Sequence, residues 1–251
     1  MATFALRDVI AASQQRPVRP FVGRLTRPPG TYLAWLLLRL GCSPTGVSFF
    51  HFGLAITACG LFAVVRPETR PFIALLVLLW QILDNSDGTM ARILKSCSKF
   101  GGYIDDLAGL FLLAFLPISI AIGLYLHPEP VADGTLFGIS ALPLELVLVC
   151  GALTSVAACM YRLMLRMAQI QFGENIGSEE DAQLTASGLT ARLMLFVKDL
   201  ENLGGYQILI LIVAAFLHCL DYYVVFYCFL EMAILIALTV KLCISGRLHE
   251  A

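Results

Sequence analysis

Long apolar runs constrain the fold of this chain more than any other feature of its sequence. Six runs approach or exceed the ~20 residues that a helix needs to cross a bilayer. They cover residues 46–65, 71–91, 101–125, 139–167, 204–220 and 222–244. Of all residues 59% are hydrophobic and 14% are charged, and the mean hydropathy is +0.82. The sequence therefore predicts an all-α integral membrane protein with six transmembrane helices.

The first 45 residues are predicted to form a cytoplasmic segment ahead of a transmembrane domain at residues 46–251. Residues 1–30 carry scattered arginines and are expected to be irregular. Residues 31–40, TYLAWLLLRL, are apolar but only about half the spanning length. They are predicted to form an interfacial helix on the membrane surface, with Trp35 at the lipid boundary.

Lysine and arginine are distributed unevenly between the segments that join the predicted spans. If the N-terminus is cytoplasmic, only Arg66 and Arg70 of the 17 such residues fall on the outer side. Cytoplasmic segments carry an excess of positive charge. The sequence therefore predicts a multi-pass protein with both termini in the cytoplasm. The net charge of −1 gives no indication of nucleic-acid binding.

Small and acidic residues share one helix face where the second predicted span ends. At about 100° per residue, Asp84, Asp87, Gly88 and Ala91 fall within about 100° of one another. Acidic side chains at the edge of a span are costly and rare, so they indicate a functional site. The alternative is that they are helix-end carboxylates facing water.

A second stripe follows on the next predicted helix, where Gly101, Asp105 and Gly109 are spaced four apart. A short basic hairpin between the two helices would bring Asp84, Asp87 and Asp105 together beside exposed backbone. Carboxylates combined with phosphate oxygens are typical ligands of Mg²⁺. The pattern therefore predicts a Mg²⁺ or Mn²⁺ site that holds a phosphate-containing substrate on the cytoplasmic side of the membrane.

The stretch DNSDGTMARILKSCSKFGGYIDDLAG, residues 84–109, resembles the signature of the CDP-alcohol phosphotransferases. That signature reads D-x2-D-G-x2-A-R-x8-G-x3-D-x3-D. Seven positions match in type and spacing: Asp84, Asp87, Gly88, Ala91, Arg92, Gly101 and Asp105. Gly109 stands where the family has its fourth aspartate, the proposed general base.

The resemblance implies a membrane transferase of phospholipid biosynthesis. In the family, the hydroxyl of a small alcohol or a lipid attacks a CDP-activated donor, and CMP leaves. The donor is expected to be CDP-diacylglycerol, giving a phosphatidyl transfer, or another CDP-alcohol. A homodimer is also implied. The resemblance further implies which residues surround the nucleotide: Asp84, Gly88, Ala91, Arg92, Gly101 and Asp105.

The missing fourth aspartate leaves the catalytic base open. Asp106 is the candidate on the same helix, about 60° around and about 4.5 Å along the axis from Gly109. Asp199 or Glu201 could reach the site from the loop at residues 168–203, where an amphipathic helix or lid is expected. A general base typically contributes about 10²–10⁴-fold in rate, so its loss favours slow or altered chemistry over none.

Two further residues are candidates for substrate contact. Arg162, at the inner end of the fourth predicted span, could bind the phosphate of an acceptor. His51, inside the first predicted span, could contact substrate, although helix packing is the favoured interpretation.

Other functions compete with the transferase. One is a family-derived protein without full catalysis that binds CDP-lipid or nucleotide, or acts as a membrane scaffold. An aspartate-rich prenyltransferase fits less well, because Ala91 and Arg92 would have no role there. A transporter finds weak support in one carboxylate, Glu231, within the last predicted span.

Overall fold

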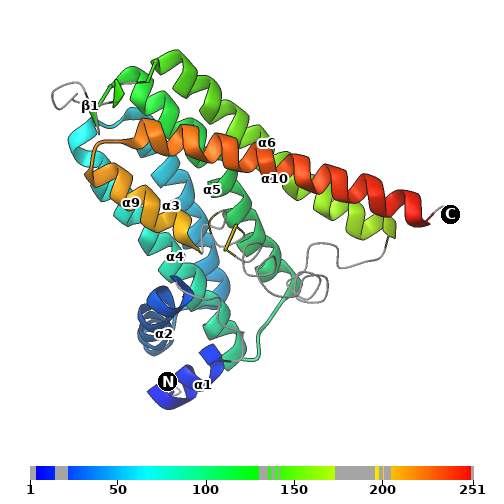
Figure 1. Ribbon diagram of the computed structural model, residues 1–251. Coiled ribbons are helices and arrows are strands. Elements are labelled where there is room, and N and C mark those ends of the chain that lie inside the picture. The colour runs from blue at the N-terminus through cyan, green and yellow to red at the C-terminus, as the bar shows by residue number, and fades with distance from the viewer. Residues whose placement is uncertain are drawn as a thin grey trace.

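The computed structural model describes residues 4–14, 22–129, 135–136, 139–140, 142–172, 196–197, 200 and 205–249. These residues are almost entirely helical (Figure 1). The helices are α1 Leu6–Gln14, α2 Val22–Arg39, α3 Pro44–Val64, the 3₁₀ turn η1 Pro67–Thr69, α4 Arg70–Ile93, α5 Lys99–Leu126, α6 Leu144–Phe172, α9 Tyr206–Phe216 and α10 Leu220–His249. A two-residue antiparallel pair joins β1 (Thr135–Leu136) to β2 (Ile139–Ser140), with Thr135 opposite Ser140.

A helix lies at each of the six predicted spans, and within the described residues four are long and apolar enough to cross a membrane. These four are α3, α5, α6 and α10. The last third of α4 is polar, and the 11 residues of α9 extend only about 16 Å. The protein is thus an all-helical membrane protein, and the count of six spans stays a prediction.

The fourth predicted span begins later than expected. The prediction placed its start at residue 139, but α6 begins at Leu144, and Ile139–Ser140 forms strand β2. Pro143 explains the boundary, because its carbonyl accepts the first helical hydrogen bond, from Val147 N at 3.1 Å. A proline disfavours helical geometry in the residue before it, so the helix does not extend toward residue 139.

The prediction of an irregular segment at residues 1–30 was wrong for the part that the structure describes, where α1 and the start of α2 are helical. Helix α1 packs on α2 and α4, and α2 begins at Val22, well before the interfacial helix predicted at 31–40. The physical reason is close packing of α2 on α4. A Cβ added at Gly30 would lie 2.8 Å from Asn85 Cβ, and Ser86 Oγ donates a hydrogen bond to Gly30 O. This packing stabilises a helix that continues through two prolines.

Close helix crossings organise the core. Helix α5 lies between α3 and α6, and α6 also packs along α10. A Cβ at Gly123 of α5 would collide with the carbonyl oxygen of Phe62 in α3. A Cβ at Gly151 of α6 would lie 2.5 Å from Ala121 Cβ. Glycine at such contacts allows helix backbones to approach closely, which is how helices associate within a membrane.

One end of the helix bundle is held by a buried ion pair. Arg70, at the start of α4, is 1% exposed and donates to Glu129 Oε1 at 2.6 Å. It also donates to the carbonyl oxygens of Gly123 and His127 at the end of α5. His218, between α9 and α10, lies 2.8 Å from the other oxygen of Glu129. Arg70 therefore connects the beginning of α4 to the end of α5.

The acidic stripes lie at the other end of α4. There α4 turns into α5, and α1 and α2 pack against α4 (Figure 1). Helices α6 and α10 run side by side and extend together away from this region, toward the C-terminus (Figure 1). The end of α4 is thus surrounded by the first turns of α3 and α5 and by the N-terminal helices.

Candidate functional site

The turn between α4 and α5 brings the two acidic stripes together. Helix α4 ends in a Schellman motif, in which Ser96 N donates to Ala91 O and Lys95 N donates to Arg92 O. Lys95 takes the left-handed conformation that this motif requires, with φ +49°. Helix α5 then begins after Ser98, whose Oγ accepts a hydrogen bond from Gly101 N at 2.9 Å. The chain reverses within five residues, as the predicted hairpin requires.

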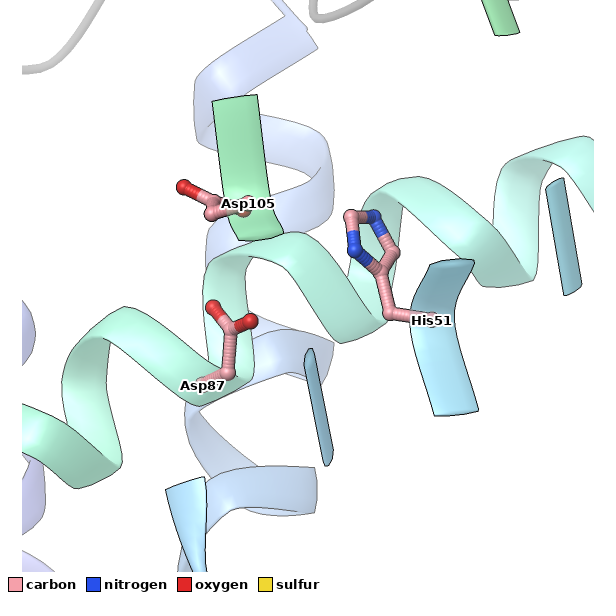
Figure 2. A group of neighbouring side chains, drawn as sticks. All are labelled: His51, Asp87 and Asp105. Atoms are coloured by element: carbon pink, nitrogen blue, oxygen red, sulfur yellow. The ribbon is translucent and has the colours of Figure 1, made fainter. Parts of the chain in front are cut away.

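Three side chains from three helices converge beside this turn (Figure 2). Asp87 comes from α4, Asp105 from α5 and His51 from α3. One ligand atom of each residue lies within 4.8 Å of those of the other two. Among the described residues this is the one such group of three or more His, Cys, Asp or Glu side chains. Two of the three predicted metal-binding aspartates are therefore adjacent.

Asp87 is buried and oriented by α3. Its side chain is 4% exposed, and Ser48 Oγ donates to Asp87 Oδ2 at 2.7 Å. A hydrogen bond to a charged group of this kind contributes about 1.5–3 kcal/mol. Each carboxylate oxygen can accept further bonds, so this contact positions Asp87 and leaves it able to bind a cation.

His51 is the member of the group that sequence reasoning did not place beside the carboxylates. It is fully buried and stacks on Trp80, with ring centroids 4.5 Å apart and an interplanar angle of 23°. The predicted packing is confirmed, but the expected satisfied histidine is not, because within the described residues neither ring nitrogen has a hydrogen-bond partner. The same ring, however, points a nitrogen toward the two carboxylates (Figure 2). The one available signal was its position three residues after Ser48, on the same helix face.

Asp84 lies outside this three-residue group. It is half-buried on α4, and its Oδ2 accepts a hydrogen bond from Gln81 Nε2 at 3.1 Å. Since it precedes Asp87 by three residues, the two carboxylates lie on one side of α4. Its predicted part in binding the metal and the nucleotide stays a prediction.

The other matched positions surround the turn. A Cβ at Gly88 would lie 3.4 Å from Arg92 Nη1, and one at Gly101 would lie 3.1 Å from Ser98 Oγ, so a side chain at Gly101 would crowd its neighbour. Arg92 Nε donates to Ala12 O of α1 at 3.0 Å. This bond fixes α1 against the end of α4. The predicted lining of a cytidine pocket by Gly88, Ala91 and Gly101 stays a prediction.

Open space surrounds the position of the missing aspartate. A Cβ at Gly109 would meet no heavy atom within 4 Å in the part of the chain that the structure describes. Asp106, the candidate base, is 71% exposed, and its Oδ2 lies 3.2 Å from Arg166 Nη2 of α6. An exposed pair of this kind contributes about 0–1 kcal/mol, so Asp106 can exchange this partner readily.

Arg162, the predicted contact for an acceptor phosphate, lies one turn before Arg166 on α6 and is exposed. Residues four apart share a helix face, so Arg162 lies on the side of α6 that reaches Asp106. The alternative bases Asp199 and Glu201, like most of the predicted lid, fall outside the described residues.

The donor set fits a divalent cation. Two carboxylates and an imidazole are common metal ligands, and within the described residues neither ring nitrogen of His51 has a hydrogen-bond partner. Leaving such a buried group unsatisfied costs about 1–3 kcal/mol, which a bound cation would offset.

The chain matches a known protein family. A family model described as CDP-alcohol phosphatidyltransferase matches residues 42–240, which include α3, the α4–α5 turn and most of α10. A search of curated proteins found no match.

Proposed function

The chain belongs to the CDP-alcohol phosphatidyltransferase family, and we propose that it transfers a phosphatidyl group from CDP-diacylglycerol to a hydroxyl acceptor. The family implies transfer of a phosphoalcohol group from a CDP-alcohol. The observation that supports activity in this chain is the convergence of Asp87 and Asp105 beside the α4–α5 turn. A role in phospholipid biosynthesis follows from this choice of donor.

Asp87 and Asp105 would hold the cation, Mg²⁺ or Mn²⁺, with Asp84 binding the metal or nucleotide from the same side of α4. The bound cation would neutralise the charge of the diphosphate and make CMP a better leaving group. Ser48 keeps Asp87 in position for this role through its hydrogen bond. Gly88, Ala91 and Gly101 leave space for the nucleotide, and Arg92 supplies positive charge beside it.

The transfer itself needs a proton acceptor. The acceptor's hydroxyl oxygen attacks the phosphorus that carries the diacylglycerol, and the bond from that phosphorus to the CMP oxygen breaks. In this proposal the hydroxyl proton passes to Asp106, the carboxylate that follows Asp105 on α5. Arg166 would then release Asp106 during the reaction, which the weakness of their exposed pair permits.

Arg162 and Arg166 favour an acceptor that carries a phosphate. Both belong to the inner half of α6, and Arg166 reaches α5 directly. A guanidinium binds phosphate oxygens in a bidentate manner, so a phosphorylated small alcohol fits this surface. We place this surface and the acidic site on the cytoplasmic side, with both termini, and expect a homodimer in the membrane, as the resemblance implies.

A second function is favoured by Gly109. A chain that has lost the family's general base could retain donor binding and act as a CDP-lipid binding protein or a scaffold. The two functions differ in one measurable property, the release of CMP.

The test is CMP release by purified protein given CDP-diacylglycerol, Mg²⁺ or Mn²⁺, and a panel of alcohols and phosphorylated alcohols. We expect acceptor-dependent CMP release, reduced at least ~100-fold by Asp87→Asn because the charge that holds the cation is lost. Glu68→Gln, an exposed change at the opposite end of α4, serves as the control. Metal-dependent binding of the CDP-lipid without CMP release from any acceptor would instead favour the binding protein.

A further inference from the structure

We propose that His51 is a metal ligand and that the cation site prefers transition metal ions, such as Mn²⁺ and Co²⁺, over Mg²⁺. This inference rests on the cation site of the proposed function. It adds a nitrogen ligand from α3 to a site that sequence reasoning built from carboxylates of α4 and α5 alone. The geometry, burial and orientation of the imidazole each support it.

The spacing of the three side chains is close to that of ligands around an ion. Their ligand atoms lie within 4.8 Å of one another, yet no hydrogen bond joins His51 to either carboxylate. Ligands about 2.1 Å from a metal are separated by about 3.0 Å when adjacent and about 4.2 Å when opposite. Small rotations of the Asp87 and Asp105 side chains would therefore bring all three ligand atoms into coordination distance.

The burial of His51 points to a ligand. The side chain is 0% exposed, and within the described residues both ring nitrogens lack a hydrogen-bond partner. A histidine needed only for packing would leave both nitrogens unsatisfied at a cost of about 1–3 kcal/mol each. A phenylalanine would fill the same volume without that cost. Coordination gives one of these nitrogens a partner.

The orientation of the ring is fixed by its neighbours. Stacking on Trp80 sets the ring plane, and one nitrogen then faces Asp87 and Asp105 (Figure 2). A ligand held in position by packing loses little conformational entropy on binding. Trp80 therefore orients His51 much as Ser48 orients Asp87.

The nitrogen ligand determines which cations the site takes. Mg²⁺ prefers oxygen ligands and retains several of its waters. Imidazole suits the transition metals, whose affinity for such sites rises from Mn²⁺ through Co²⁺. His51 should therefore strengthen the binding of Mn²⁺ and Co²⁺ and contribute little to the binding of Mg²⁺.

The experiment is electron paramagnetic resonance of purified full-length protein loaded with Mn²⁺ alone, in a pulsed mode that detects nitrogen bound to the metal. We expect nitrogen coupling in the wild type and in His218→Asn, a change at the opposite end of the bundle. The coupling should be lost in His51→Phe, which retains an aromatic ring against Trp80. Titration with Co²⁺ should show at least ~100-fold weaker binding in His51→Phe, since loss of a group that only orients a metal ligand already costs about 10–100-fold. Mg²⁺ affinity should change little.

The outcomes distinguish a failure of the role of His51 from a failure of the proposed cation site. Saturable Mn²⁺ binding to the wild type without nitrogen coupling would overturn the role of His51 and leave a carboxylate site and the proposed function intact. The same conclusion would follow if His51→Phe retained the coupling. If the wild type bound no Mn²⁺ or Co²⁺, both this inference and the proposed cation site would be wrong. The wild-type spectrum makes the test independent of whether His51→Phe folds.

Discussion

At the scale of single residues, the geometry of the site depends on a few side chains of α3, α4 and α5 that hold Asp87 and His51 in place. Asp87 is fixed by Ser48, and His51 is fixed by Trp80. Ser48 and Trp80, which make these orienting contacts, lie outside the acidic motif at residues 84–109. Gly109 is the position where this chain departs from its family, and the structure leaves open space there.

Restoring the missing carboxylate should raise activity. In Gly109→Asp the new Cβ meets no atom of the described chain within 4 Å, so the helix accepts the side chain without strain. If the site lacks only its base, CMP release should increase by up to about 10²–10⁴-fold. The control is Gly102→Asp, which adds the same charge on α5 at an exposed position with equally open space. A folded Gly109→Asp protein with unchanged CMP release would contradict this expectation and favour the binding protein.

At the scale of helices, backbones approach closely at several glycines. Helix α5 meets α3 at Gly123 and α6 at Gly151, and α2 meets α4 at Gly30. The Gly123 contact sets the position of α5, which carries Asp105, relative to α3, which carries His51. The geometry of the site therefore depends on crossings one or more turns away from it.

Adding a single methyl group at one crossing should destabilise the protein. Gly123→Ala places Cβ against the carbonyl oxygen of Phe62, which belongs to a helix backbone and has little freedom to move. Overpacking of this kind costs about 1–3 kcal/mol. The measurement is the thermal midpoint in detergent. Gly60→Ala on α3, where a Cβ meets nothing within 4 Å, should be neutral or slightly stabilising. Equal thermal midpoints for the two variants would show that the α3–α5 crossing tolerates a side chain at Gly123, and would contradict this prediction.

At the scale of the whole molecule, polar groups are separated between the two ends of α4. One end holds the carboxylates, His51 and the α4–α5 turn, and the other holds the pair of Arg70 with Glu129. Arg70 is one of only two basic residues on the predicted outer side, and it is buried among helix ends. The guanidinium of Arg70 pairs with Glu129 inside the fold. Of the two basic residues on the predicted outer side, Arg66 is therefore the exposed one.

The predicted orientation can be measured with Cys97, an exposed residue between α4 and α5. In a variant whose other exposed cysteines, Cys159 and Cys243, are replaced by serine, a membrane-impermeant maleimide should label Cys97 in inside-out vesicles only. Glu68→Cys, added to the same variant together with Cys97→Ser, should be labelled in right-side-out vesicles only. The reverse pattern would place the acidic site outside the cytoplasm.

The helical membrane class, the reversal of the chain after Ile93 and the proximity of Asp87 to Asp105 could all be predicted from the sequence. These features follow from local information, because apolar length, residue spacing and turn formation depend on neighbouring residues. The family followed as well, since its signature lies within one stretch of the chain.

Only the tertiary structure brought His51 to the carboxylates, because it lies more than thirty residues before Asp87 and no spacing rule connects separate helices. The helices of the N-terminal region were also missed, since α1 and α2 pack against α4 and these contacts are distant in sequence. Contacts between helices depend on which faces meet. In this chain small residues such as Gly30 and Gly123 lie at the close crossings, where a side chain would not fit.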